Sequence, residues 1–472
     1  MRIFLSHRNF TPPTAGPIPP MAGPDKHKFR CDPAEGGPKG DNARAKRVLI
    51  WLMIGLILSI AHQSFAAGSG GFRIEMIDAE AHGMGAAFAG DASNPSAIYY
   101  NPAGLTQLKG ENHLSLGMGL IMPSITHESP SGVKTDMGRQ EFFIPDIFLV
   151  SDFGLEKFVF GFGGTSSWGT GTEWSDTSFS RYVATRSDVN NTDLMFTGAY
   201  KVNDQLSLGL SVDHDYSVVS KSKKLLQGGV GDDGDYQLKG KGHGWGHRVA
   251  LLYEINEQHQ FGLQYRSPIE ENYRGKTYLN HLNNAGATPY NTYFGGSSYE
   301  TEISSESELP QSVVAGYCFE PNEKWTINFD LEWMDWSSIE QELIEYQDEQ
   351  NVARLAVLNS GNPAPKDWYS AWSTAFGAEY DFNDKLRLRG GYYFHQTPIP
   401  DENFHSNLPD SNSHSLAVGF GYDLNDKTTF DLAYSHMFFE KQSITNSTAG
   451  ASIDGDYTQG VNLLLVTLNR KF

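Results

Sequence analysis

FGAEYDFNDKLRLRGGYY, from Phe376 to Tyr393, is the stretch of sequence that decides the fold. On both sides of Asn383-Asp384, apolar and polar residues alternate with the period of two that a β-strand shows when its faces meet different surroundings. Asn and Asp accept turn conformations and can bond to their own backbone, so this pair predicts a tight turn between two antiparallel strands. The second strand carries Arg387 and Arg389 on one face. The inner face of a soluble β-sandwich packs in an apolar core and would not accommodate these two charges. The stretch therefore predicts a hairpin whose sheet encloses a polar interior.

The same turn recurs along the chain, each time three residues after an aromatic residue. The turns are Asn203-Asp204, Asn256-Glu257, Asn322-Glu323, Asn383-Asp384 and Asn425-Asp426, after Tyr200, Tyr253, Phe319, Tyr380 and Tyr422. Successive turns lie 42 to 66 residues apart, which leaves room for two strands and a long loop at the opposite end. Short turns on one side, long loops on the other and aromatic residues at strand ends are typical of outer-membrane β-barrels.

The number of turns predicts the number of strands. A further turn at 152–154 brings the short turns to six, which join 12 strands and leave a first strand at 114–122 and a last one ending at Phe472. The sequence therefore predicts an all-β protein, in which residues 110–472 form a 14-stranded antiparallel transmembrane β-barrel. The barrel must close, because an open edge in lipid would leave backbone groups unpaired at several kcal/mol each.

The N-terminal residues have a different character. Residues 1–46 hold 8 of the 22 prolines and no periodicity, so we expect a disordered extension or a start codon placed too far upstream. Basic residues up to Arg47, an apolar run at 48–61 and small residues at Ser64 and Ala66 predict a signal peptide at 47–66, cleaved after Ala66. The alternative is a membrane anchor, but the apolar run is shorter than the ~20 residues that a spanning helix needs.

Composition excludes several function classes. Removing residues 1–66 takes away nine basic and four acidic residues and lowers the formal net charge from -20 to -25, which argues against nucleic acid as a partner. Cys318 would be the one remaining cysteine, so no disulfide can form within the mature chain. The histidines are scattered and show no spacing of a nucleophile and its base. We therefore expect no enzymatic activity, no cofactor and no metal site.

Residues 94–105, NPSAIYYNPAGL, resemble the plug signature of the FadL/TodX family of outer-membrane transporters for long-chain fatty acids and other hydrophobic compounds. The resemblance implies that residues 67–109 form an N-terminal hatch inside a 14-stranded barrel. It places Asn101, Pro102, Ala103 and Gly104 in the hatch. The stretch QTPIPDENFHSNLPD at 396–410 and the terminal Phe472 resemble the same family.

The alternation also assigns charged residues to the inner face of the barrel. They are Asp213, Asp215, Asp330, Glu332, Arg387, Arg389 and Asp431. One interpretation is an ion network that holds the lumen and the hatch, and the other is that Arg387 and Arg389 bind the carboxylate of a ligand.

Two neighbouring strands suggest where an apolar ligand would pass. The second strand is apolar on both faces, so Phe143, Ile147 and Leu149 are candidate ligand contacts; the alternative is that the inner face only packs against the hatch. Gly161, Gly163 and Gly164 of the third strand permit a kink. The resemblance implies that a kink there makes a lateral opening in the wall, whereas the alternative is that these glycines make room for hatch side chains.

These observations predict a passive, monomeric transporter in the outer membrane of a Gram-negative bacterium, surrounded by outer-membrane lipids. The resemblance implies that its ligand is a long-chain fatty acid or another hydrophobic small molecule, caught at the outer loops, passed by a rearrangement of the hatch and released laterally through the barrel wall. A general diffusion porin for polar solutes is the alternative, and a barrel enzyme is the third class.

Overall fold

The computed structural model describes residues 70–74, 77–228 and 233–472. The expected extension at 1–46 and the expected signal peptide at 47–66 lie outside the described residues. Among the residues that are described, no helix is both long and apolar enough to cross a bilayer.

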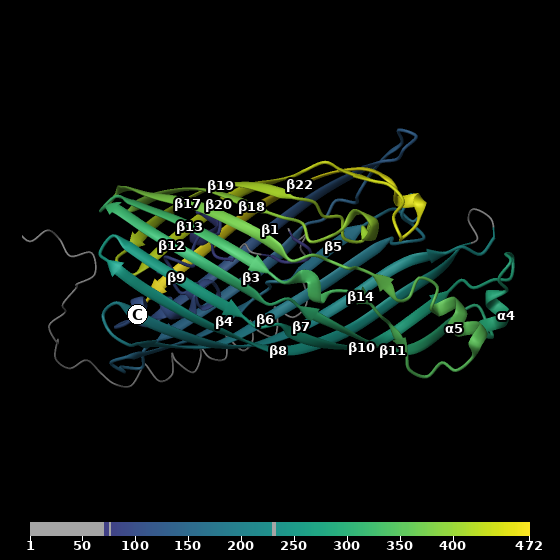
Figure 1. Cartoon of the computed structure of the whole chain (residues 1–472), viewed down its shortest axis with the longest axis horizontal. Helices are drawn as coiled ribbons and strands as arrows, with labels where there is room; N and C mark the ends of the chain where they lie inside the picture. Colours follow the sequence, from purple (N-terminus) through teal and green to yellow (C-terminus); the bar gives the residue numbers. More distant parts are fainter. Residues whose placement is uncertain (1–69, 75–76, 229–232) are drawn as a thin grey trace, which may run out of the picture. The chain divides into compact units, whose positions relative to one another are not determined.

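Fourteen antiparallel strands, several of them interrupted, form one closed barrel, as the sequence predicts (Figure 1). They are β1 (His113–Glu128), β3 (Phe142–Ser151), β4 (Phe158–Thr165) with β5 (Gly169–Glu173), β6 (Arg186–Lys201), β7 (Leu206–Leu225), β8 (Gly234–Asn256), β9 (His259–Arg266) with β10 (Ile269–Asn280), β11 (Tyr299–Leu309) with β12 (Ser312–Asn322), β13 (Trp325–Met334), β17 (Ala371–Asn383), β18 (Leu386–His395), β19 (Ser413–Asn425), β20 (Thr428–Phe439) and β22 (Gly455–Lys471). The first and last strands close the barrel, from His113 opposite Lys471 to Glu128 opposite Asp456.

The short turns lie where the sequence predicts them, because a side-chain oxygen accepts a backbone N–H in each: that of an asparagine in five turns and that of Asp152 in the sixth. The Oδ1 atom of Asn383 accepts hydrogen bonds from the N–H groups of Lys385 and Leu386, at 3.0 and 3.1 Å. Asn203 does the same with the residues two and three positions later, at 2.9 Å each. The hairpin from which the fold was inferred pairs Phe376 with Tyr392.

The opposite end of the barrel carries long loops with short elements of their own. These are β2 (Lys134–Asp136), η2 (Trp336–Ser338), β14 (Gln341–Glu342), β15 (Glu345–Tyr346), β16 (Ala364–Pro365), η3 (Asp401–Asn403), β21 (Gln442–Ile444), η4 (Ala451–Ile453) and the helices α4 (Tyr290–Phe294) and α5 (Val352–Leu358). Helix α5 begins where the Asn351 side chain accepts the N–H groups of Ala353 and Arg354. Phe294 of α4 and Leu358 of α5 pack with Leu279 and Leu282 in one buried apolar cluster.

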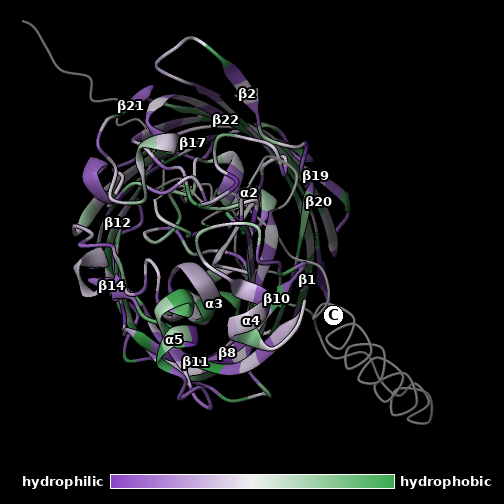
Figure 2. Ribbon diagram, turned by 90° about the vertical axis from the view of Figure 1, so that its right-hand side faces the viewer, coloured by the Kyte–Doolittle hydropathy of each residue, from purple (hydrophilic) through white to green (hydrophobic). Residues whose placement is uncertain are grey.

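The hatch segment, by which we mean the described residues between 70 and 109, lies inside the ring of strands (Figure 2). It contains α2 (Ala79–Gly83), α3 (Ala97–Tyr100) and the 3₁₀ helix η1 (Pro102–Leu108). Its hydrogen bonds reach different sides of the wall: Ala79 bonds to Thr467 on β22, His82 to Ser435 on β20, and Thr106 to Ser207 on β7. A segment that bonds to strands so far apart in the barrel occupies the lumen.

The two faces of the wall differ as a lipid environment requires. Large apolar side chains are exposed on the outside, for example Leu208, Leu210 and Val212 on β7 and Leu416 and Val418 on β19. The alternate positions turn inward and carry most of the buried charged residues. The candidate site described next is built around these inward-facing polar side chains.

Candidate functional site

Asn101 joins three parts of the structure through one fully buried side chain. Its Oδ1 atom accepts from the N–H of Ala103 at 3.1 Å and so begins η1. Its Nδ2 atom donates to the carbonyl oxygens of Ala89, at 2.8 Å, and of Leu251 on β8, at 3.1 Å. Pro102 follows at the first helical position, where its missing N–H leaves no hydrogen bond unmade.

The two residues that follow are small because the neighbouring chain is close. A Cβ at Gly104 would lie 2.4 Å from the Cβ of Ala92. The backbone N of Ala103 lies against the wall, since a Cβ at Gly209 of β7 would be 2.3 Å from it. The four residues predicted from the sequence, 101–104, thus form one tightly packed unit between the hatch segment and the wall.

A second contact between the hatch segment and the wall centres on Asp330 of β13. Its Oδ2 atom accepts hydrogen bonds from the N–H groups of Phe88 and Ala89, both at 2.8 Å. Beside it, Gly262 and Gly316 are paired across β9 and β12. A Cβ at Gly262 would lie 1.9 Å from the carbonyl oxygen of Ala89, so the hatch backbone rests directly on the wall.

Arg389 is the centre of an ion network rather than an open anion site. Its buried guanidinium contacts the carboxylates of Glu80 at 3.1 Å, Glu379 at 2.6 Å and Asp431 at 2.7 Å. Glu80 belongs to the hatch segment, whereas Glu379, Arg389 and Asp431 belong to the wall strands β17, β18 and β20. This network therefore ties the hatch segment to three strands of the wall.

Arg387 is held by Asp423, at 2.9 Å. Neither Arg387 nor Arg389 lines the cavity described below. The proposed role of Arg387 and Arg389 in binding a ligand carboxylate therefore has no support here, because acidic side chains of the protein already neutralise both.

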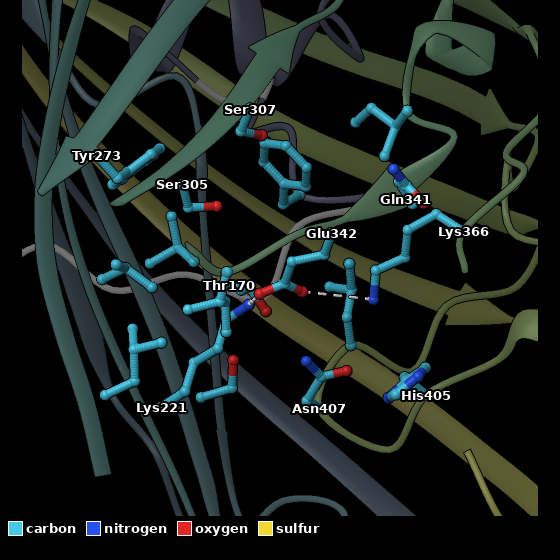
Figure 3. A pocket seen from close by; sticks show the side chains of 18 of the residues that line it. Thr170, Lys221, Tyr273, Ser305, Ser307, Gln341, Glu342, Lys366, His405 and Asn407 are labelled. Atoms are coloured by element: carbon cyan, nitrogen blue, oxygen red, sulfur yellow. Dashed lines mark hydrogen bonds and ion pairs between the residues drawn. The ribbon is translucent and has the colours of Figure 1, made fainter. Parts of the chain in front are cut away.

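A cavity of about 150 Å³ lies within the barrel, between the strands and the loops (Figure 3). Its apolar lining comes from strands, loops and the hatch segment alike: Phe72, Val189, Val219, Leu238, Ile303, Ile339, Ile344, Trp368, Ile399 and Leu408. Phe72 sits in an aromatic box, with ring centroids 5.7 Å from Trp168, 5.1 Å from Trp336 and 6.1 Å from Trp368.

One corner of this cavity is charged. Lys221 of β7 bonds to Glu342, and the Nζ atom of Lys366 lies 3.6 Å from the same carboxylate (Figure 3). Burial favours the neutral acid, but the two lysines outweigh it and lower the pKa of Glu342. His405 beside them is neutral, because burial lowers its pKa to about 3. Glu271 also lines the cavity and accepts a hydrogen bond from Tyr273 at 2.6 Å.

Sequence reasoning missed this corner. The run KSKK at 221–224 continues the alternation of its strand and would have placed Lys221 inward. Glu342 and Lys366 lie in loop elements, where no periodicity indicates which way a side chain points.

Backbone pairing between β3 and β4 stops part of the way along the two strands, and we call the unpaired stretch the gap. The ladder runs from Ser151 opposite Phe160 to Ile147 opposite Gly164 and then ends. In the described part of the chain, residues 142–146 of β3 pair with β1 on one side and with no strand on the other. The third strand turns inward at 166–168 and continues as β5, whose pairing partner among the described strands is β6.

The inward turn is held by the start of the hatch segment. The N–H of Ile74 donates to the carbonyl oxygen of Ser167 at 2.9 Å, and the N–H of Gly169 donates to that of Phe72 at 2.7 Å. The predicted glycines flank this feature in different ways. A Cβ at Gly161 or Gly163 would lie 2.7 or 2.9 Å from the Ile98 side chain, so these two make room for the hatch segment. Gly164 is the last residue of β4 that pairs with β3 before the gap.

Phe143, Ile147 and Leu149 face the wrong way for ligand contacts in the lumen. The register pairs Phe143 with Leu120 and Ile147 with Leu116, residues of the outer face of β1, and Phe143 is 48% exposed. The inner face carries Phe142, Ile144, Asp146, Phe148 and Val150. Because both faces of this strand are apolar, alternation alone could not decide which one turned inward.

Comparison with known proteins agrees with this architecture. The family described as "Outer membrane protein transport protein (OMPP1/FadL/TodX)" matches residues 57–472. A long-chain fatty acid transport protein of Escherichia coli (strain K12) is 25% identical over 423 residues, covering 81% of this chain and 91% of the relative. The same-named protein of Salmonella typhi is 26% identical over 410 residues, covering 81% and 90%.

Solved structures share the fold. A FadL homologue of Pseudomonas aeruginosa superposes with a TM-score of 0.73 at 18% identity, covering 85% of this chain and 99% of that one. The toluene transporter TodX of P. putida superposes with a TM-score of 0.64 at 18% identity, covering 86% and 99%.

Proposed function

The chain belongs to the OMPP1/FadL/TodX family of outer membrane transport proteins, and we propose that it is a passive transporter of long-chain fatty acids or other hydrophobic molecules. Relatives of this chain are named long-chain fatty acid transport proteins, and TodX, a protein of the same fold, is named a toluene transporter. A general diffusion porin is not favoured, because the hatch segment occupies the lumen of this barrel.

The observation that carries the proposal is the cavity between strands and loops. Its walls are mostly apolar, and at one corner Lys221 and Lys366 share the single carboxylate of Glu342. This group of three carries one net positive charge, whereas Arg387 and Arg389 are outnumbered by the carboxylates that contact them. Apolar walls suit an alkyl chain, since each buried CH₂ contributes about 0.8 kcal/mol. An ammonium group suits a carboxylate head group, because it donates charge-assisted hydrogen bonds. An amphiphilic ligand with an anionic head matches both features.

The proposed route begins at the outer loops. The loop residues Ile339, Ile344 and Leu408 line the cavity and offer the first apolar contact. From the cavity the ligand meets Phe72, whose carbonyl oxygen holds the inward turn of the third strand. A ligand that displaces Phe72 would therefore loosen the same backbone that borders the gap beside β3.

Exit through that gap is the energetically favourable end of the route. Releasing an alkyl chain into periplasmic water would forfeit about 0.8 kcal/mol for each CH₂ exposed. An opening toward the bilayer keeps the chain in an apolar medium throughout. No catalytic step is needed, so we propose that the protein transports its ligand unchanged and acts as a monomer.

Ligand mass spectrometry on protein extracted in mild detergent tests this function. The expected result is a copurified hydrophobic or fatty-acid ligand, together with saturable fatty-acid binding by the stripped protein. Reconstituted protein should not admit sugars in a liposome-swelling assay. Sugar permeation without any hydrophobic ligand would instead identify a porin.

A further inference from the structure

The two edges of the gap carry polar side chains at the same level of the wall. The ladder between β3 and β4 ends at Ile147 opposite Gly164, and one more step of the same register would place Asp146 opposite Thr165. Both side chains belong to the inner face, and the two residues are 5% and 0% exposed. The inner mouth of the gap therefore has a carboxyl group on one edge and a hydroxyl group on the other.

Asp146 differs from the other carboxyl groups of the inner face. Asp213 and Asp431 are each held by an arginine, at 2.6 and 2.7 Å. Among residues 70–74, 77–228 and 233–472, Asp146 forms no ion pair, and its buried Oδ1 atom has no hydrogen-bond partner. The charged group that interacts with it from the hatch segment is Asp78, a second carboxyl group. The described part of the chain thus supplies no counter-charge for Asp146.

The structure nevertheless makes room for this carboxyl group. Gly117 of β1 lies directly opposite Asp146. A Cβ at Gly117 would lie 2.2 Å from the Oδ2 atom of Asp146, so the carboxyl group rests on the bare backbone of the next strand. On the other edge of the gap, the Oγ1 atom of Thr165 is also buried and has no partner in the described chain.

The surroundings decide the charge of Asp146. Phe142, Ile144 and Phe148 occupy the neighbouring positions of the same face of β3, and all three are buried. A lone carboxylate costs far more in such a place than the neutral acid does, and a second carboxyl group nearby adds to that cost. Asp146 is therefore a neutral acid with an O–H to donate. Together with the hydroxyl of Thr165, it gives the gap one hydrogen-bond donor on each edge.

We propose that Asp146 and Thr165 form a head-group site at the inner mouth of the gap, where both donate hydrogen bonds to the carboxyl oxygens of a departing fatty acid. This inference rests on the proposed function and names the residues that hold the polar end of the ligand while its alkyl chain enters the gap. Neither residue lines the lumen cavity, so the site is separate from Lys221 and Lys366. Neutral donors suit a head group about to enter lipid, because they hold it without an ionic bond that would have to be broken there.

A fatty acid that carries a photoreactive diazirine next to its carboxyl group tests this site on the purified full-length protein. Peptide mass spectrometry after illumination should find labels in the wild type at 142–148 and 163–168, and also in the cavity at 339–344. Asp146→Leu with Thr165→Val keeps the branching of both side chains but removes both donors. This variant should show about tenfold less label at the gap, because two hydrogen bonds are lost, and unchanged label in the cavity.

Two further variants separate the donors from other effects of substitution. Asp146→Asn with Thr165→Ser keeps a donor on each edge and should retain the label at the gap. Ser413→Ala, which removes an equally buried and unpartnered hydroxyl group on β19, should leave all labelling unchanged. Heat-modifiable gel mobility checks that the variants fold.

The pattern of labels distinguishes failure of this site from failure of the proposed function. Label in the cavity but not at the gap of the wild type would overturn the head-group site alone. Undiminished label at the gap in the folded variant that lacks both donors would do the same. Absence of label at both places would contradict the proposed function, and this site with it.

Discussion

Phe72 and Gly169 are joined by a backbone hydrogen bond of 2.7 Å, from the N–H of Gly169 to the carbonyl oxygen of Phe72. Phe72 lines the lumen cavity, and Gly169 opens β5 just after the inward turn of the third strand. One bond thus connects the wall of the ligand cavity to the border of the gap. We propose that displacement of Phe72 by a ligand reaches the gap through this one hydrogen bond.

Asn101→Ala should loosen the hatch segment while the barrel remains folded. The substitution removes the cap of η1 and leaves the carbonyl oxygens of Ala89 and Leu251 without these donors. An unsatisfied buried group costs about 1–3 kcal/mol. Limited proteolysis of the hatch segment should become at least tenfold faster, and fatty-acid uptake should change. Unaltered proteolysis and uptake would show that residues 101–104 are only a turn.

Gly262→Ala should displace the hatch segment from the wall, since a Cβ there would lie 1.9 Å from the carbonyl oxygen of Ala89. Overpacking of this kind costs about 1–3 kcal/mol. The matched control is Gly390→Ala, because a Cβ at Gly390 meets nothing within 4 Å. Hydrogen exchange at 84–92 should accelerate in the first variant and not in the second. Equal exchange in both would contradict the direct contact between hatch backbone and wall.

Lys221→Gln combined with Lys366→Gln should weaken binding of a fatty acid about tenfold and leave binding of the corresponding fatty alcohol within twofold. The reason is that the substitutions remove charge but keep the apolar lining. Isothermal titration with the two ligands measures the difference. Lys385→Gln, in a short turn outside the cavity, serves as the control. An equal loss for acid and alcohol would mean that the lysines only hold Glu342 and its loop.

Seating of the hatch segment should depend on pH through His82. Burial lowers the pKa of this histidine to about 4, and its Nε2 atom lies 2.9 Å from the hydroxyl of Ser435. The unseated state, with an ordinary pKa near 6.5, takes up a proton first. The contribution of His82 is therefore complete above pH 6.5 and declines as the pH falls toward 4.

Hydrogen exchange of 79–83 between pH 7 and pH 4 measures this dependence. The wild type should open more readily at the acid end, and His82→Gln should remove that part of the change. Identical pH profiles for the two proteins would contradict this assignment.

Much of this fold could be predicted because its signals are local. The Asn-acid turns, such as Asn383-Asp384, form through side-chain bonds to the next two or three residues, and strand alternation follows from a polar lumen inside an apolar belt. The number of strands followed from these two signals. The NPAG block at 101–104 was likewise found from the sequence, through its resemblance to a family.

The parts that sequence could not give depend on tertiary contacts. Phe143 was placed on the wrong face because its strand is apolar on both sides, so only the pairing with Leu120 decides its direction. Arg389 was a reasonable anion site until Glu80 of the hatch segment was seen against it. The lysine corner joins Lys221 of a strand to Lys366 of a distant loop, and no sequence period connects them.

Reversible closure of the gap tests the central claim, lateral exit, most directly. Continuing the β3–β4 register beyond Ile147 and Gly164 would place Ile144 opposite Ser167. Ile144→Cys with Ser167→Cys, in a Cys318→Ser background, should therefore cross-link when the wall closes, either as a disulfide or through a short bifunctional thiol reagent verified by mass spectrometry.

The measurement is fatty-acid uptake by cells carrying this variant, before and after cross-linking. The account predicts at least a tenfold loss of uptake in the closed form, recovery when a disulfide is reduced, and undiminished ligand binding in the cavity by the purified closed protein. Full uptake through a barrel whose wall is verified as closed would contradict lateral exit and route the ligand down the lumen.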